Sequence, residues 1–239
     1  MKYLINFSNN KKSKQWKRNN SVRLDVKDKT LTCNFITDDQ NVVGSVSMDN
    51  FDLEDVTLGV YATAQLTKLL TALDNDVKMR VNNADGTAYS INLSDTTTNV
   101  TFMLADLSVI RQVPAMKQLP DFNVKIKLTK DFADKFVKSK NALPETENFA
   151  IESDAMGTNM ILNYSTLNTN RITWPTVPEG VQVDLKATCF SANLFKEILV
   201  ANKEAETGFI EVSSAGLAKV SFTGKDYSST YYLVQLQAN

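Results

Sequence analysis

Residues 55–70 read DVTLGVYATAQLTKLL, and residues 183–198 read VDLKATCFSANLFKEI. In each stretch apolar and polar residues alternate as in a half-buried β-strand, and a short amphipathic helix follows. The two stretches are 128 residues apart, and Thr63 and Ser191 fall at matching positions where a hydroxyl is expected to cap each helix. The sequence therefore predicts a diverged duplication. Further matches are Leu66 with Leu194 and Lys68 with Lys196.

The segments after these two helices also correspond. Each copy continues with a strand, a turn that contains glycine, a second strand and a strongly apolar third strand. The predicted strands are 77–81, 88–93 and 100–104 in the first copy and 209–212, 218–222 and 230–234 in the second.

The segments before the two helices are more diverged. Residues 128–142 predict a helix with Phe132 and Phe136 on one arc and lysines opposite, and its counterpart is expected at 3–16. Each of these helices precedes two strands, at 22–26 and 30–36 in the first copy and at 149–152 and 160–164 in the second. Each copy is thus expected to be a small α+β domain.

The segment between the copies is unlike a free linker. Pro114 and Pro120 argue against a helix, and the apolar side chains favour a segment that lies along a surface. We expect a first domain at 1–106, a crossover at 107–121 and a second domain at 122–239.

The composition argues against the common kinds of catalytic and metal site. The chain has no histidine, and its eight glycines form no phosphate-cradling loop. Cys33 and Cys189 lack the spacing of a zinc site, and we expect two buried, reduced thiols. We therefore expect no enzyme, no cofactor and no metal. Without a transmembrane run or an apolar signal-peptide core at the start, we expect an intracellular protein.

The charge is unevenly distributed along the chain. Residues 1–23 contain seven basic side chains and no acidic one, whereas the remaining residues contain 19 basic and 27 acidic side chains. A local basic patch on an acidic body favours contact with a polyanion on one face. A solvated basic arm is the alternative.

The order and spacing of these segments resemble one known family. The resemblance rests on residues 52–61 with the helix through Leu70, on residues 98–102, 113–114 and 119–122, on the lysine-bearing helix at 127–140 and on the last strand at 231–236. These segments resemble the DNA sliding clamp of T-even-type bacteriophages. That family is related in fold to proliferating-cell nuclear antigen. The chain departs from it at 8–10 and 19–20, where poor helix formers stand.

The resemblance implies a fold and a function. The fold would be α+β, with two similar clamp-type domains that each pack two helices on antiparallel sheet. Three chains would close head to tail into a pseudo-sixfold ring, with the helices lining the hole. The ring would encircle duplex DNA without sequence preference, tether the replicative DNA polymerase for processive synthesis and be loaded by an ATPase. It would have no catalytic activity and would work in the cytoplasm of the infected bacterial host.

The resemblance also implies two sets of site residues. The expected DNA contacts are Lys11, Lys12, Lys14, Lys17, Arg18, Lys68, Lys135, Lys138, Lys140, Lys196 and Lys203. The expected pocket for partner peptides comprises Val109, Ile110, Leu119, Leu233 and Leu236. Plain solvated lysine faces, and apolar residues that simply pin the crossover to the sheet, are the alternatives.

Two other functions stay open from the residues alone. A duplicated β-rich phage structural or assembly protein would also oligomerise, but it predicts no clustering of lysines on matched helices. A hydrolase that relies on carboxylates alone would need a focused pair of acids, and the sequence marks out none.

Overall fold

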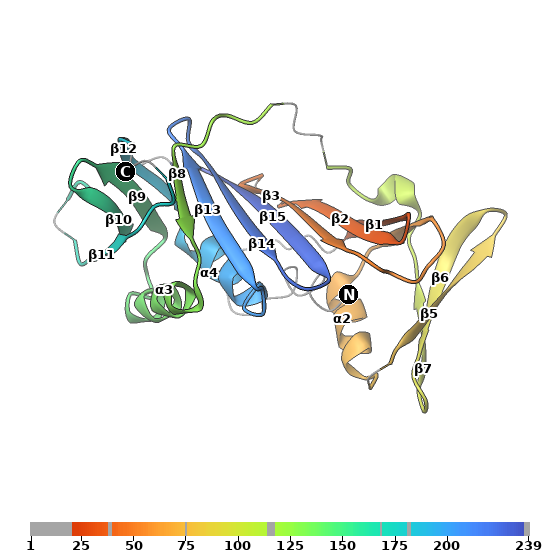
Figure 1. Ribbon diagram of the computed structural model, residues 1–239. Helices are drawn as coiled ribbons and strands as arrows, with labels where there is room; N and C mark the ends of the chain where they lie inside the picture. Colours follow the sequence, from red (N-terminus) through yellow and green to blue (C-terminus); the bar gives the residue numbers. More distant parts are fainter. Residues whose placement is uncertain are drawn as a thin grey trace. The chain divides into compact units, whose positions relative to one another are not determined.

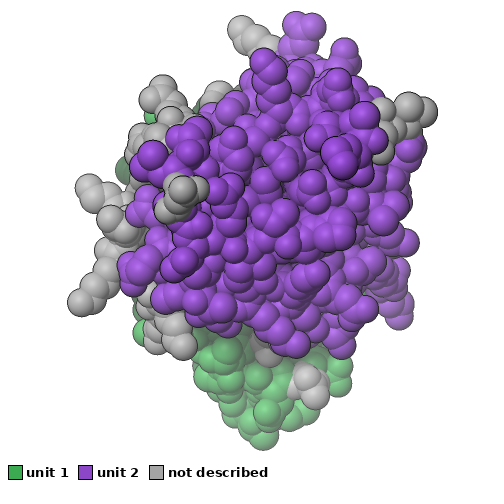
Figure 2. Space-filling view, turned by 90° about the vertical axis from the view of Figure 1, so that its left-hand side faces the viewer, with its two compact units in different colours: residues 1–114, 226–228 green, residues 115–225, 229–239 purple. Residues whose placement is uncertain are grey.

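The computed structural model describes residues 21–37, 40–74, 76–113, 118–167, 169–180 and 183–236. The chain divides into two compact units, coloured separately in Figure 2. Unit 1 comprises residues 1–114 with 226–228, and unit 2 comprises residues 115–225 with 229–239. The helix expected at 3–16 lies outside the described residues.

Unit 1 contains two antiparallel sheets and one described α-helix (Figure 1). Strands β4-β1-β2-β3 are hydrogen-bonded in that order as part of one sheet, and β5-β6-β7 form a separate sheet. The strands are β1 Val22–Lys27, β2 Thr30–Ile36, β3 Val42–Met48, β4 Val56–Val60, β5 Lys78–Ala84, β6 Thr87–Ser94 and β7 Asn99–Met103. The α-helix is α2, Thr63–Thr71, and a short 3-10 helix, η1, covers Leu107–Val109.

Apolar residues alternate along the strands of unit 1 and build its core. On β1, Val22, Leu24 and Val26 are buried while the residues between them are partly exposed. Leu66 and Leu70, one turn apart on α2, are also buried. In the second sheet Phe102 is buried and stacks on Tyr61 at a centroid distance of 5.7 Å.

Unit 2 has the same plan with one additional described helix and strand. Strands β11-β10-β9-β12 form one sheet, and β15-β14-β13-β8 are hydrogen-bonded in that order as part of another. The strands are β8 Val124–Lys127, β9 Asn148–Asp154, β10 Gly157–Leu162, β11 Ile172–Thr176, β12 Leu185–Ser191, β13 Thr207–Ser213, β14 Leu217–Thr223 and β15 Tyr227–Val234. The helices are α3, Lys130–Ala142, and α4, Ala192–Ala201.

The strand orders confirm the duplication. The order β4-β1-β2-β3 in unit 1 repeats as β12-β9-β10-β11 in unit 2, and β5-β6-β7 repeats as β13-β14-β15. Helix α2 follows β4 as α4 follows β12. Strand β8, which pairs with β13, has no counterpart among the described residues of unit 1. The expected α+β class with helices on antiparallel sheet is therefore confirmed.

The two predicted helix caps have different outcomes. Ser191 caps α4, because its side chain accepts a hydrogen bond from the backbone N–H of Leu194 at 3.4 Å. The prediction for Thr63 is wrong, because α2 already begins at Thr63 and its N-cap is Ala62, which makes no side-chain capping bond. Thr63 is buried instead. Thr63 therefore matches Ser191 in the sequence but does not cap its helix.

Candidate nucleic-acid interface

Helices α3 and α4 lie together in unit 2 because aromatic side chains lock them to the sheet below. Phe136 of α3 is fully buried and meets Phe195 of α4 edge to face at 4.8 Å. Phe136 also meets Phe149 of β9 at 5.4 Å, and Phe149 stacks on Phe195 at 4.8 Å. Such pairs fix orientation as well as burying area. The aromatic cluster therefore holds the two helices in a fixed relation to each other.

The ends of the two helices are also held. Thr129 caps α3, because its hydroxyl accepts a hydrogen bond from the N–H of Phe132 at 3.2 Å. At the end of α4 the side-chain amide of Asn202 donates to the carbonyl of Ile198 and to the hydroxyl of Tyr231. The side-chain carbonyl of Asn202 accepts from the hydroxyl of Ser229 at 2.8 Å. Because Tyr231 and Ser229 belong to β15, this network ties α4 to the second sheet of unit 2.

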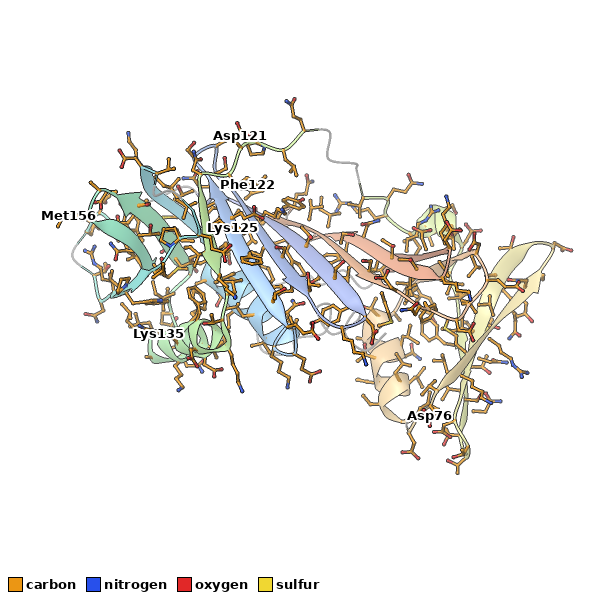
Figure 3. All side chains as sticks on the ribbon, in the orientation of Figure 1. Asp76, Asp121, Phe122, Lys125, Lys135 and Met156 are labelled. Carbon is orange, nitrogen blue, oxygen red and sulfur yellow. The ribbon has the colours of Figure 1, made fainter. Side chains whose placement is uncertain are left out.

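Exposed lysines lie on the opposite side of these helices from the core. Lys135 and Lys138 are exposed on α3, and Lys203 is exposed just after α4. The Lys135 ammonium lies over the ring of Trp174, 5.4 Å from its centroid, and Figure 3 labels Lys135 on α3. In unit 1, Lys68 is exposed in the last turn of α2. These four expected DNA contacts are thus accessible to an anion.

Lys196 is more restrained than the exposed lysines. Its side chain is half-buried on α4, and its ammonium donates a hydrogen bond to Oδ1 of Asn141 on α3 at 2.6 Å. Asn141 itself is exposed. The sequence pattern did not single out Asn141, although it stands three residues after Lys138 and therefore shares a helix face with it.

The structure assigns Lys140 a role other than the expected DNA contact. Its side chain is 5 % exposed, and its ammonium donates to the carbonyl oxygen of Pro144 at 2.7 Å. Burial lowers the pKa of Lys140, the Lys196 ammonium lowers it further, and Glu145 acts in the opposite direction. The position of Lys140 at the end of the apolar arc explains this burial. Its ammonium closes the loop after α3 instead of facing solvent.

The remaining expected DNA contacts belong to the start of the chain. Lys11, Lys12, Lys14, Lys17 and Arg18 lie outside the described residues.

The residues of the expected peptide pocket fall in both units and differ in exposure. Val109 of η1 is 70 % exposed and Leu119 is 40 % exposed, so both can offer apolar surface. Ile110 and Leu233 are buried in the cores, so neither offers a surface to a partner. Leu236 is partly buried against Ala150, Ile161 and Cys189.

A groove in unit 1 was not anticipated from the sequence. It has a volume of about 590 Å³ and lies between the segment that leads into β4 and the β5–β6 hairpin. Leu53, Met79 and Leu107 supply apolar lining, while Asp55 and Arg80 supply charge. Its residues come from segments that are distant in sequence, so no local pattern could have indicated it.

The titratable groups of the described residues form no metal site. No group of three or more His, Cys, Asp or Glu side chains in this part of the chain could hold a metal ion. Cys33 and Cys189 are buried and free, as predicted, and burial raises the pKa of both thiols, that of Cys33 to about 12. No helix in the described ranges is long and apolar enough to cross a membrane.

One carboxylate stands out by its hydrogen bonds. Asp95, in the turn between β6 and β7, accepts bonds from the backbone N–H groups of Asp74, Thr97 and Thr98. These bonds lower its pKa to about 2. Asp95 therefore joins the loop after α2 to the β6–β7 turn of unit 1.

Comparison with known proteins rests on structure alone. No protein-family model matches the sequence, and no curated protein matches it. The proliferating-cell nuclear antigen (PCNA) of A. fulgidus, solved with the C-terminal region of FEN-1 bound, is similar with a TM-score of 0.77 and 14% identity. That match covers 100% of this chain and 95% of the other.

Two further structures agree with the first. PCNA from Entamoeba histolytica matches with a TM-score of 0.73 and 17% identity over 99% of this chain and 94% of that one. A chain of the PCNA2–PCNA3 complex from Sulfolobus tokodaii matches with a TM-score of 0.73 and 12% identity over 98% of this chain and 94% of that one. The chain therefore has the PCNA-like clamp fold over its whole length.

Proposed function

We propose that this protein is a DNA sliding clamp of the T-even-type bacteriophage kind. It encircles duplex DNA, tethers the replicative polymerase and catalyses no reaction itself. The observation that carries the proposal is the lysine-bearing helical face of unit 2, where Lys135, Lys138 and Lys203 are exposed. Lys68 is exposed on α2 of unit 1, at the position that matches Lys196 on α4.

Lysine suits contact with DNA that has to move. A compact ammonium on a flexible stem meets phosphate without requiring one fixed geometry. Phosphate contacts carry no sequence information, so such a face accepts any duplex. Exchange of these contacts with counterions lets the protein slide, and the closed ring rather than affinity keeps it on the DNA.

Edge strands support assembly into a ring. In the described part of the chain β7 ends one sheet of unit 1, and β11 ends one sheet of unit 2. Apolar side chains are exposed on or beside both edges, with Met103 at 53 % and Val177 at 85 %. Pairing of β7 with β11 of the next chain would cover both edges. Such a head-to-tail interface closes into a homotrimer when each step turns the chain by a third of a circle.

The proposal includes partners other than DNA. The A. fulgidus structure carries a bound C-terminal region of FEN-1, which supports a peptide-binding surface here as well. Val109 and Leu119 are the exposed apolar candidates on the crossover. The partners would be the phage polymerase and an ATP-driven clamp loader inside the infected bacterium.

A loading experiment tests the function. The full chain is incubated with its polymerase, loader and ATP on a nicked or primed DNA circle, and retention at high salt is measured before and after the circle is cut. We expect retention only on the intact circle and longer extension products in the presence of the protein. Equal release from circular and cut DNA, with no gain in product length, would exclude a sliding clamp. A trimer that never retains DNA would instead favour a structural or assembly protein.

A further inference from the structure

Lys196 differs from the other candidate DNA contacts in being held by a neighbour. Its ammonium donates to Oδ1 of Asn141 at 2.6 Å, across the packed pair of helices α4 and α3. The aromatic contact between Phe136 and Phe195 fixes these two helices to each other. The hydrogen bond therefore joins two rigid elements rather than two loose side chains.

Lysines predominate around this bond, although Glu145 also acts on the Lys140 ammonium. Lys138 is exposed three residues before Asn141 and shares its helix face. Beneath them lies the buried Lys140, whose pKa is lowered first by burial and then by the Lys196 ammonium. No ion pair between described residues includes Lys138, Lys140 or Lys196. The cluster therefore has donors and positive charge to offer an anion.

The chemistry of Asn141 completes the cluster. Its Oδ1 accepts from Lys196, which leaves the exposed amide Nδ2 as a donor. The Lys196 ammonium has three donors and uses one of them on Asn141, so two are left for a ligand. An ammonium already held in place loses less conformational freedom on binding than a free lysine does.

We propose that Asn141 is a positioning residue that holds the Lys196 ammonium, so that Lys138, Asn141 and Lys196 form one preformed contact for a backbone phosphate of duplex DNA. This inference rests on the proposed function and adds a residue to it. The other exposed lysines would meet phosphates in many conformations, whereas this contact would meet them in one.

The test compares the binding of a short, fluorescently labelled linear duplex by full-chain variants over a range of salt concentrations. Asn141→Ala is expected to lower affinity roughly three- to tenfold at every salt concentration, as removal of one hydrogen bond would. The slope of log K against log salt should not change, because no cation is removed. Lys196→Met should lower affinity and flatten the slope by about one, because one cation fewer meets a phosphate.

Three further variants sharpen the comparison. Asn141→Asp should behave like Lys196→Met, because a carboxylate neutralises the ammonium, and Asn141→Gln should recover part of the affinity. Asn34→Ala, at an exposed position on β2, is the matched control and should bind like the original protein. Thermal unfolding of each variant checks that it folds.

The outcomes separate this inference from the proposed function. If the original protein binds duplex and Asn141→Ala binds equally well, or flattens the slope as Lys196→Met does, the positioning role is wrong and the clamp proposal stands. If the original protein binds no duplex even at low salt, the positioning role is wrong, and the clamp proposal is decided separately by retention on the intact DNA circle.

Discussion

Lys140 and Lys138 lie two residues apart on α3, and the structure predicts opposite consequences for replacing them. Lys140 is 5 % exposed and donates to the carbonyl of Pro144 at 2.7 Å, whereas Lys138 is exposed. Lys140→Met keeps most of the aliphatic stem and removes the ammonium. Lys138→Met makes the same chemical change on the surface and is the matched control.

The expected magnitude follows from the Lys140 hydrogen bond. A hydrogen bond to a charged group contributes about 1.5–3 kcal/mol to stability. Burial lowers the pKa of Lys140, so desolvation of the ammonium offsets part of this gain. We therefore expect Lys140→Met to lower the free energy of unfolding of unit 2 by about 1–2 kcal/mol. Lys138→Met should change it by less than about 0.5 kcal/mol.

Denaturant unfolding followed by tryptophan fluorescence measures the difference. The chain has two tryptophans, Trp16 and Trp174, so a Trp16→Phe background leaves Trp174 of β11 as the reporter of unit 2. The two variants should rank the other way in duplex binding. Lys138→Met should weaken binding, whereas Lys140→Met should not. The reasoning is refuted if Lys140→Met unfolds at the original denaturant midpoint and flattens the salt dependence of DNA binding.

Three other substitutions test the fold and its charges. Phe136→Ala should cost about 3–5 kcal/mol because it empties the centre of the aromatic cluster, and Phe136→Leu should cost less; equal denaturant midpoints would contradict the packing. Thr129→Ala should cost about 1 kcal/mol through loss of the α3 cap, whereas Thr129→Ser should unfold like the original protein. Asp95 has a pKa of about 2 against an ordinary 3.8, so its stabilisation is complete above the ordinary value and is lost as pH falls towards 2. Asp95→Asn should lower the melting temperature at neutral pH. The melting temperature of this variant should also fall less than that of the original protein between pH 3.8 and 2, and an unchanged pH profile would count against this role.

The sequence predicted the elements whose pattern is local. The alternating strands, the apolar arc of α3 and the Ser191 cap all depend on neighbouring residues, and the structure has them. Strands β3, β8 and β11 were missed. Gly44 interrupts the apolar pattern of β3 in the sequence. A side chain at Gly44 would meet the ring of Phe35, which occupies that space. Pro175 interrupts the strand pattern of β11 in the sequence, but β11 is an edge strand, and an edge strand tolerates proline.

The candidate site was predictable to a smaller extent. Spacing identified Lys135 and Lys138 as outward-facing, because the apolar arc of α3 defines the opposite side. Lys140 falls near the apolar arc at the end of α3, but its hydrogen bond to Pro144 depends on the path of the following loop, which spacing does not give. Nor could it find Asn141, because the partner of its side chain stands 55 residues later in the chain.

Pro175 also limits which strands can join the open edge of β11. Proline has no backbone N–H, and within sheets it is found where the missing donor would point away from the neighbouring strand. A strand that approaches from outside therefore finds a gap in the row of donors opposite its carbonyl groups. Chance pairing with an unrelated chain is penalised, while a partner matched to that gap loses nothing. Pro175 thus makes β11 hard to recognise in the sequence, and it also disfavours pairing of this edge with an unmatched strand.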